Sequence, residues 1–189
     1  MEKLAEKIKI ALCKNNPALT VEQGETIQFG LECILNEASK IIAYFLIFAL
    51  FSLTGHYLIA VAYFTVSRVF AGGYHAETYL KCFLVSFIIL SAGIIIGSQW
   101  GLPLTARIIL QLASIAMAWI FAPVDHPNKP IISVERRKRF KYLSVIVFII
   151  LASITFLLEE RLAATAVMIL FIEALSLPAG KITKRRISI

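Results

Sequence analysis

Long apolar stretches, separated by short polar segments, dominate the pattern of this chain. From about residue 41 to residue 70 almost every position is apolar. Four further apolar stretches cover about 79–97, 104–122, 142–158 and 162–177. These lengths are close to the roughly 20 residues that a helix needs to cross a hydrocarbon core of about 30 Å. The pattern predicts an all-α, polytopic integral membrane protein, because only helices and closed barrels satisfy the backbone inside lipid.

The stretch 41–70 is too long for a single crossing. Thirty helical residues would extend for about 45 Å, against a hydrocarbon core of about 30 Å. Thr54-Gly55-His56 lies near the middle of the stretch and predicts a turn there. We therefore expect two shorter helices in this region and six transmembrane helices in the whole chain.

A different pattern precedes these stretches. Leu4, Ile8 and Leu12 recur every four residues among lysines, which predicts an amphipathic helix with a basic face. Asn15-Asn16-Pro17 should end this helix, and Thr20-Val-Glu-Gln23 is the pattern of a capping box that opens a second amphipathic helix. The two helices either pack on the rest of the protein or lie among the lipid headgroups and guide a substrate, and these two possibilities are compatible. We thus expect amphipathic helices over 1–36 and a six-helix membrane domain over 37–189.

Composition supports a membrane protein, and charge predicts its orientation. The chain is 59% hydrophobic with a mean hydropathy of +0.80, whereas soluble domains are usually about 45–50% apolar. Its net charge is +7. With six helices and a cytoplasmic N-terminus, only Arg107 and Arg161 of the nineteen basic residues lie outside. The positive-inside rule therefore predicts a cell-membrane protein with both termini cytoplasmic. The first long apolar stretch also begins too late for a usual signal peptide.

One polar segment carries residues typical of nucleophilic catalysis. Gly72-Gly73 is followed by His75, and Cys82 comes seven residues after the histidine. An imidazole can take the proton of a thiol, and the thiolate can then attack a carbonyl carbon. On one continuous helix the two residues would lie about 10.5 Å apart along the axis, too far for proton transfer. We therefore expect an irregular turn from the glycines through His75, with the next helix starting near 76–78.

The basic residues beside this segment have two interpretations. Arg68 and Lys81 are candidates for a cation that stabilises a Cys82 thiolate, or they are interfacial residues that reach for the headgroups. Cys13 and Cys33 are interpreted as structural, since three cysteines form no paired framework. Glu173, inside the last apolar stretch, is a possible hydrogen-bond partner for the site.

A second marked segment, 122–132, contains three prolines and precedes a basic cluster. It is either a cytoplasmic loop whose charge only sets orientation, or a docking surface for an acidic part of a substrate. The candidate substrate-binding residues are Lys129, Arg136, Arg137, Lys138 and Arg139. No metal or other cofactor is predicted, because the His, Cys, Asp and Glu residues here lack the spacing of metal ligands. Nucleotide-binding glycine patterns are absent, and nothing supports a role with nucleic acid.

The residues Arg68-Val-Phe-Ala-Gly-Gly-Tyr-His75, with Cys82 seven positions on, resemble the signature of the accessory gene regulator B (AgrB) peptidases of Gram-positive bacteria. The segment Ala122-Pro123 through Ile131, with the basic residues after it, is similar to that family's second marked stretch. The resemblance covers nearly the whole chain.

The resemblance implies a membrane cysteine endopeptidase of quorum sensing. Such an enzyme cleaves a short precursor peptide, AgrD, and forms a cyclic thiolactone or lactone signal. It implies that Cys82 and His75 are catalytic. We expect Arg68, Gly72 and Gly73, which lie beside them in the sequence, to support them, and the charge distribution predicts that the active site lies on the cytoplasmic side. It further implies a homodimer surrounded by membrane lipids. The alternative, from another functional class, is a small peptide transporter without catalytic activity. Such transporters have interrupted helices, and the break predicted near Gly55 matches this feature only in part.

Overall fold

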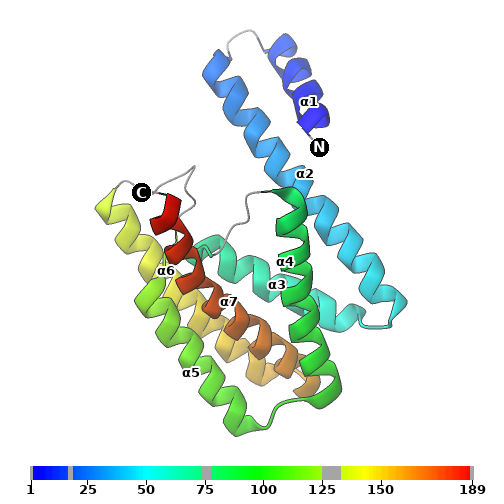
Figure 1. Ribbon diagram of the computed structural model, residues 1–189, viewed down its shortest axis with the longest axis vertical. Coiled ribbons are helices and arrows are strands. Elements are labelled where there is room, and N and C mark those ends of the chain that lie inside the picture. Colours follow the sequence, from blue (N-terminus) through cyan, green and yellow to red (C-terminus); the bar gives the residue numbers. More distant parts are fainter. Residues whose placement is uncertain (1, 17–18, 74–77, 125–132, 188–189) are drawn as a thin grey trace. The chain divides into compact units, whose positions relative to one another are not determined.

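The computed structural model describes residues 2–16, 19–73, 78–124 and 133–187, with side chains described as far as residue 181. All regular elements in these ranges are helical, and the only β-type pairing among them is a single bridge between Gly72 and Val124. The elements are α1 (Glu2–Asn15), α2 (Val21–Leu50), α3 (Thr54–Ala71), α4 (Tyr79–Ile95), η1 (Ile96–Trp100), α5 (Leu104–Phe121), α6 (Val134–Ile154), η2 (Thr155–Leu157) and α7 (Glu160–Ile187) (Figure 1). The expected all-α class is confirmed.

The chain divides into two compact units, Met1–Ile47 and Phe48–Ile189. In the first unit, α1 packs against the beginning of α2, where Lys9 Nζ donates a hydrogen bond to Gln28 Oε1 at 2.6 Å. The capping box at the start of α2 is confirmed: the Thr20 N–H bonds Gln23 Oε1 at 3.0 Å, and the Gln23 N–H bonds Thr20 Oγ1 at 3.2 Å. The division after Ile47 lies inside α2, whereas the sequence predicts a functional boundary at residue 36.

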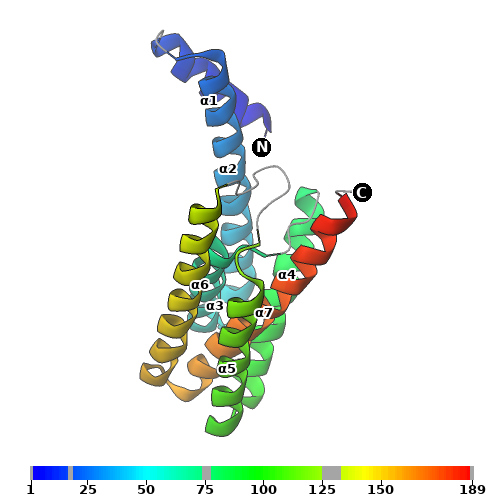
Figure 2. The same ribbon diagram turned by 90° about the vertical axis from the view of Figure 1, so that its left-hand side faces the viewer.

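In the second unit α7 is the central helix, in contact with α3, α4, α5 and α6 (Figure 2). Every residue from Leu162 to Ile172 except Thr165 is apolar, which is the pattern of a buried helix. Small side chains let the neighbouring helices approach closely. A Cβ atom at Gly97 of η1 would lie 2.5 Å from the backbone nitrogen of Thr165. The α7 residues with no exposed surface include Ala163, Ala164, Ala166, Val167, Ile169, Leu170, Glu173, Ala174 and Leu177.

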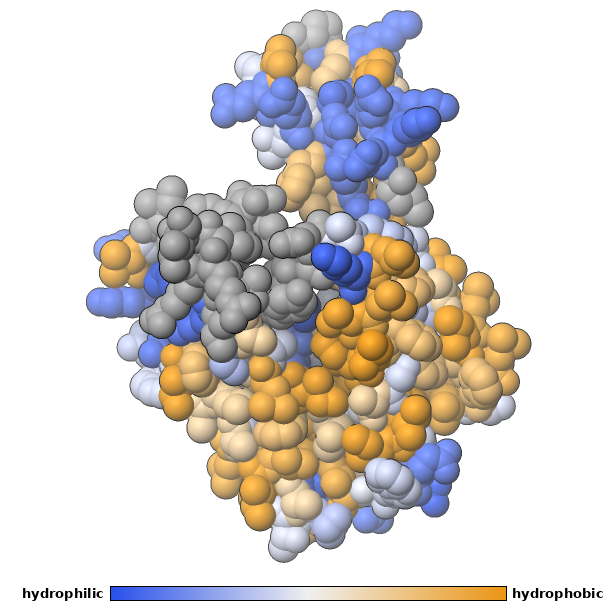
Figure 3. Space-filling model, viewed as in Figure 1, coloured by the Kyte–Doolittle hydropathy of each residue, from blue (hydrophilic) through white to orange (hydrophobic). Residues whose placement is uncertain are grey.

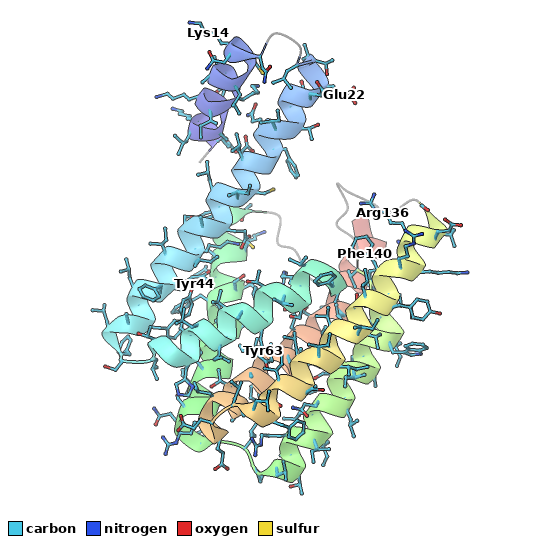
Figure 4. All side chains as sticks on the ribbon, turned by 180° about the vertical axis from the view of Figure 1, so that it is seen from behind. Lys14, Glu22, Tyr44, Tyr63, Arg136 and Phe140 are labelled. Atoms are coloured by element: carbon cyan, nitrogen blue, oxygen red, sulfur yellow. The ribbon has the colours of Figure 1, made fainter. Side chains whose placement is uncertain are left out.

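Polar side chains inside this bundle bond across helices. Tyr63 on α3 donates to the Leu151 carbonyl of α6 at 2.9 Å; Tyr63 is labelled in Figure 4. His56 Nδ1 lies 2.8 Å from Thr165 Oγ1, and Arg161 donates to the Ser98 carbonyl at 3.0 Å. Because each such group would be costly in lipid without a partner, these bonds fix which helices are neighbours.

Five helical segments are long and apolar enough to cross a membrane: α2, α4 with η1, α5, α6 with η2, and α7 as far as Lys181. Figure 3 shows the apolar surface that covers much of the second unit on the face seen there. These features are those of a multi-pass membrane protein. Helix α3, the second half of the 41–70 stretch, is not among the five, so the expected count of six is not confirmed.

The break in the 41–70 stretch lies slightly before the expected turn. Helix α2 ends at Leu50, and Ser52 adopts a positive φ of 58°. The Leu53 N–H bonds the Phe48 carbonyl at 2.9 Å and the Ser52 N–H bonds the Ala49 carbonyl at 3.0 Å, the pattern of a Schellman motif. Gly55 is instead inside α3.

Two helices are longer than the apolar pattern indicates. The second amphipathic helix and the first apolar stretch form one helix, α2, because no proline or glycine separates them at 36–41. Helix α6 begins at Val134, where Ser133 Oγ accepts a hydrogen bond from the Arg136 N–H at 3.4 Å. The basic residues 136–139, expected in a loop, are therefore helical.

Candidate functional site

The end of α3 lies against the segment that follows α5. Gly72 has φ 76° and Gly73 has φ 152°, both in the region that favours glycine. The Gly72 N–H bonds the Arg68 carbonyl at 2.9 Å, and the Val124 N–H bonds the Ala71 carbonyl at 2.9 Å. A Cβ atom at Gly72 would lie only 1.8 Å from the Val124 carbonyl oxygen. The diglycine thus gives both the turn and the space for a backbone contact between the two segments marked in the sequence.

A buried ion pair lies beside this turn. Arg68 Nη1 on α3 donates to both carboxylate oxygens of Glu173 on α7, at 3.1 Å each. The Glu173 side chain has no exposed surface, and the Arg68 side chain is 17% exposed. The guanidinium also lies 5.0 Å from the centre of the Phe64 ring, a cation–π contact. The positive charge of Arg68 is therefore matched by the negative charge of Glu173.

Gly73 rests directly on one face of α7. A Cβ atom there would lie 2.9 Å from Glu173 Oε1 and 2.8 Å from Ser176 Oγ. One turn further along, a Cβ at Gly180 would lie 3.0 Å from the Gly73 carbonyl carbon and oxygen. Sequence reasoning overlooked Ser176 and Gly180. Their positions three and seven residues after Glu173 place all three on one helical face, a signal that was available.

Cys82 lies in the first turn of α4. Thr78 caps this helix, and its Oγ1 accepts from the Lys81 N–H at 3.3 Å while its carbonyl accepts from the Cys82 N–H at 3.0 Å. Cys82 is partly exposed. The expected interruption between the glycines and the cysteine is confirmed, since α3 ends at Ala71 and α4 begins at Tyr79. His75 lies outside the described residues, so its pairing with Cys82 stays a prediction.

The basic cluster consists of the four exposed residues 136–139 in the first two turns of α6. Arg136 and Arg139 line an open groove together with Ser133 and Glu135. Figure 4 labels Arg136 beside Phe140, and the guanidinium lies 5.8 Å from the centre of that ring. Cations near a helix N-terminus oppose the helix dipole, so the cluster does not stabilise its own helix. Lys129, the remaining predicted substrate-binding residue, lies outside the described residues.

The second unit brings these elements together at one end. Ser144 Oγ on α6 donates to the Phe70 carbonyl of α3 at 2.8 Å, and Lys181 Nζ on α7 donates to the Ile120 carbonyl of α5 at 3.5 Å. The C-terminal parts of α3, α5 and α7 therefore lie at the same end as the N-terminal part of α6. This end carries the diglycine turn, the ion pair and the basic cluster.

Comparison with known proteins identifies the family. The sequence profile of Accessory gene regulator B matches residues 2–177. A putative AgrB-like protein of Clostridium perfringens SM101 is 29% identical over 163 residues, covering 80% of this chain and 74% of that protein. The Accessory gene regulator protein B of Staphylococcus aureus Newman is 26% identical over 151 residues, covering 80% and 79%. No solved structure matches. Because the profile match covers nearly the whole chain, this protein belongs to the accessory gene regulator B (AgrB) family.

Proposed function

We propose that this protein is a membrane cysteine endopeptidase of quorum sensing, which converts an AgrD-like precursor peptide into a cyclic thiolactone or lactone. The observation that carries the proposal is the position of Cys82 in the first turn of α4, a helix separate from α3, which ends at Ala71. Because α3 and α4 are two separate helices, His75 and Cys82 need not keep the separation of about 10.5 Å that one continuous helix would impose.

In the first step His75 accepts the thiol proton and the Cys82 sulfur attacks a peptide carbonyl of the precursor. The tetrahedral intermediate collapses with cleavage of the C–N bond. The protonated His75 delivers its proton to the departing amine, and the acidic C-terminal tail leaves as a peptide. The N-terminal part of the precursor stays attached to Cys82 as a thioester.

In the second step a cysteine thiol or serine hydroxyl within the same peptide attacks that thioester. A new thioester or ester bond closes the ring, and the Cys82 sulfur leaves and regains a proton. Exchange of one thioester for another is nearly balanced in free energy. A site that excludes water and holds the internal nucleophile close therefore favours cyclisation over hydrolysis.

The same proposal includes an orientation and an assembly. We place the end with the diglycine turn and the basic cluster in the cytoplasm, with both chain termini, in agreement with the positive-inside rule. The protein would act as a homodimer among membrane lipids. The exposed cations at 136–139 would then face anionic headgroups and the acidic tail of the precursor.

Reactivity of the thiol tests the proposed pair. In a variant with Cys13→Ala and Cys33→Ala, Cys82 is the single thiol, and iodoacetamide should alkylate it about tenfold faster at neutral pH than a small free thiol. His75→Ala should remove most of this excess and leave a rate that simply rises with pH. Mass spectrometry of timed samples in lipid nanodiscs measures the rate. Equal pH profiles with and without His75 would exclude the imidazole as the base.

The basic cluster should contribute to binding rather than to chemistry. Replacement of Arg136, Arg137, Lys138 and Arg139 by Gln should weaken binding of a peptide with an acidic tail by about tenfold at low salt, with a much smaller effect in high salt. Fluorescence anisotropy of a labelled peptide at two ionic strengths measures this. An unchanged affinity at low salt would leave orientation in the membrane as the only role of these charges.

A further inference from the structure

Basic residues crowd the start of α6. Positions 136–139 and Lys141 are all basic, and Glu135 is the single acidic residue among the first eight positions of this helix. Cations at a helix N-terminus oppose the helix dipole, and like charges three or four residues apart repel each other. In the described part of the chain the ion pairs are Lys40–Glu37 and Arg68–Glu173, so neither involves Lys141. An anion from outside the protein would relieve this cost.

A tryptophan and a tyrosine meet beside Lys141, where α5 contacts α6 (Figure 1). The ring centres of Trp119 on α5 and Tyr142 on α6 lie 6.3 Å apart in an edge-to-face arrangement, and both side chains are exposed. Lys141 Nζ lies 5.0 Å from the centre of the Trp119 ring. Trp and Tyr are enriched where a membrane meets water. The two rings therefore place the Lys141 ammonium at the level of the lipid headgroups.

Exposed apolar side chains continue from this aromatic pair toward the other end of the bundle. On α6, Ile146 and Ile149 follow Tyr142 by four and seven residues, and on α5, Leu112 precedes Trp119 by seven residues. These spacings place each row on the helical face of its ring. Because α6 begins at the end where α5 finishes, both rows run in the same direction. Seven residues of helix extend about 10.5 Å, most of one leaflet of about 15 Å.

We propose that this face of α5 and α6 binds an anionic phospholipid, with the headgroup phosphate held by Lys141 and Lys138 and an acyl chain along the apolar rows. Lys138 is exposed and precedes Lys141 by three residues and Tyr142 by four, so it lies on the same helical face. Cations directly above an aromatic and apolar surface match a phosphate that carries acyl chains, and their charge favours an anionic over a zwitterionic headgroup. The inference goes beyond the proposed function and does not depend on catalysis.

The two tryptophans of the chain provide the measurement. Trp119 belongs to the proposed site, whereas Trp100 ends η1 at the other end of the bundle. Trp100→Phe and Trp119→Phe each leave one tryptophan in the protein, which is placed in nanodiscs of phosphatidylcholine and phosphatidylglycerol. Bromine on the acyl chains of one lipid or the other quenches nearby tryptophan fluorescence and gives the relative affinity of the two lipids. We expect Trp119 to report a preference for phosphatidylglycerol of at least about tenfold, and Trp100 to report almost none.

Two lysine variants of the Trp119 protein separate a site from overall charge. Lys141→Gln should lower the preference about fivefold. Lys181→Gln is the matched control, because it removes the same charge at the same end of the bundle. The Lys181 ammonium also lies over an aromatic ring, 5.4 Å from the centre of Phe121, but it donates to the Ile120 carbonyl. We expect Lys181→Gln to keep the preference of the parent.

Three results would overturn the lipid site. The first is an equal preference at Trp119 and Trp100, and the second is an equal effect of Lys141→Gln and Lys181→Gln. The third is relief of Trp119 quenching by excess soluble glycerol phosphate or by a peptide with an acidic tail. Glycerol phosphate would assign the cations to a free phosphate group, and the peptide would assign them to a protein partner. Retained quenching with both competitors supports the lipid.

Discussion

Cys82→Ala should abolish cleavage of the precursor, with a loss of at least about 1000-fold in rate, because loss of a nucleophile removes the covalent pathway. Cys82→Ser should retain little more cleavage activity than Cys82→Ala. Without a base that activates it, a serine hydroxyl is a much weaker nucleophile than a thiolate. The measurement is mass spectrometry of a synthetic precursor, with a central cysteine and an acidic tail, incubated with the protein in nanodiscs. The thioester-linked enzyme should appear only with Cys82.

The other two cysteines give matched controls for this prediction. Cys13 Sγ packs near Gly24, where an added Cβ would lie 3.3 Å from it, and Cys33 is exposed. Both lie in the first unit. Cys13→Ala and Cys33→Ala should therefore cleave the precursor at the parental rate. Cleavage at the parental rate by Cys82→Ala would refute the proposed mechanism, whereas loss of cleavage in all three variants would indicate a general effect of thiol removal.

Gly72→Ala should be the most destabilising exchange of a single glycine for alanine in the described part of the chain. Two costs combine at this position. Its φ of 76° costs an L-residue about 1–2 kcal/mol, and the new methyl group would lie 1.8 Å from the Val124 carbonyl oxygen. That oxygen belongs to the backbone, so the whole contact between the two marked segments must separate. We expect a large fall in the thermal unfolding midpoint in detergent and loss of processing.

Comparison of Gly72→Ala with Gly101→Ala isolates the steric part of this effect. Gly101 has a similar φ of 65°, but an added Cβ there would meet nothing within 4 Å. The control therefore shares the backbone strain and lacks the collision. The midpoint of Gly72→Ala should fall well below that of Gly101→Ala. Equal midpoints would show that Gly72 and Val124 do not lie against each other as the structure describes.

The local sequence predicted the position of a helix correctly where the length of an apolar stretch and the capping residues indicated the same bounds. The apolar stretches predicted near 79–97 and 104–122 became α4 with η1 and α5, and Thr20 with Gln23 formed the expected capping box. The break at Ser52 was displaced from its expected position. The break depends on Ser52 in the left-handed backbone conformation, a position usually occupied by glycine at the end of a helix. The start of α6 was hidden because a basic run breaks the apolar pattern without preventing a helix.

The residues of the candidate site also divide into those that local sequence predicted and those that only the fold revealed. Cys82, His75 and the two glycines stood out because thiol, imidazole and diglycine are unusual between apolar helices. The sequence did not reveal the partner of Arg68, because Glu173 is 105 residues away in the chain. Ser176 and Gly180 share a helical face with Glu173, but no local rule says what that face contacts.

Sequence alone determined that the chain is a set of apolar helices, and it predicted a nucleophile and a base near the junction of two of them. Its residues also carried the family resemblance that the comparisons confirmed. Only the tertiary structure decided which charge is paired and which backbone segments meet. Local propensity and apolar length act over a few turns of helix, whereas the Arg68–Glu173 pair and the Gly72–Val124 contact join helices that only packing brings together.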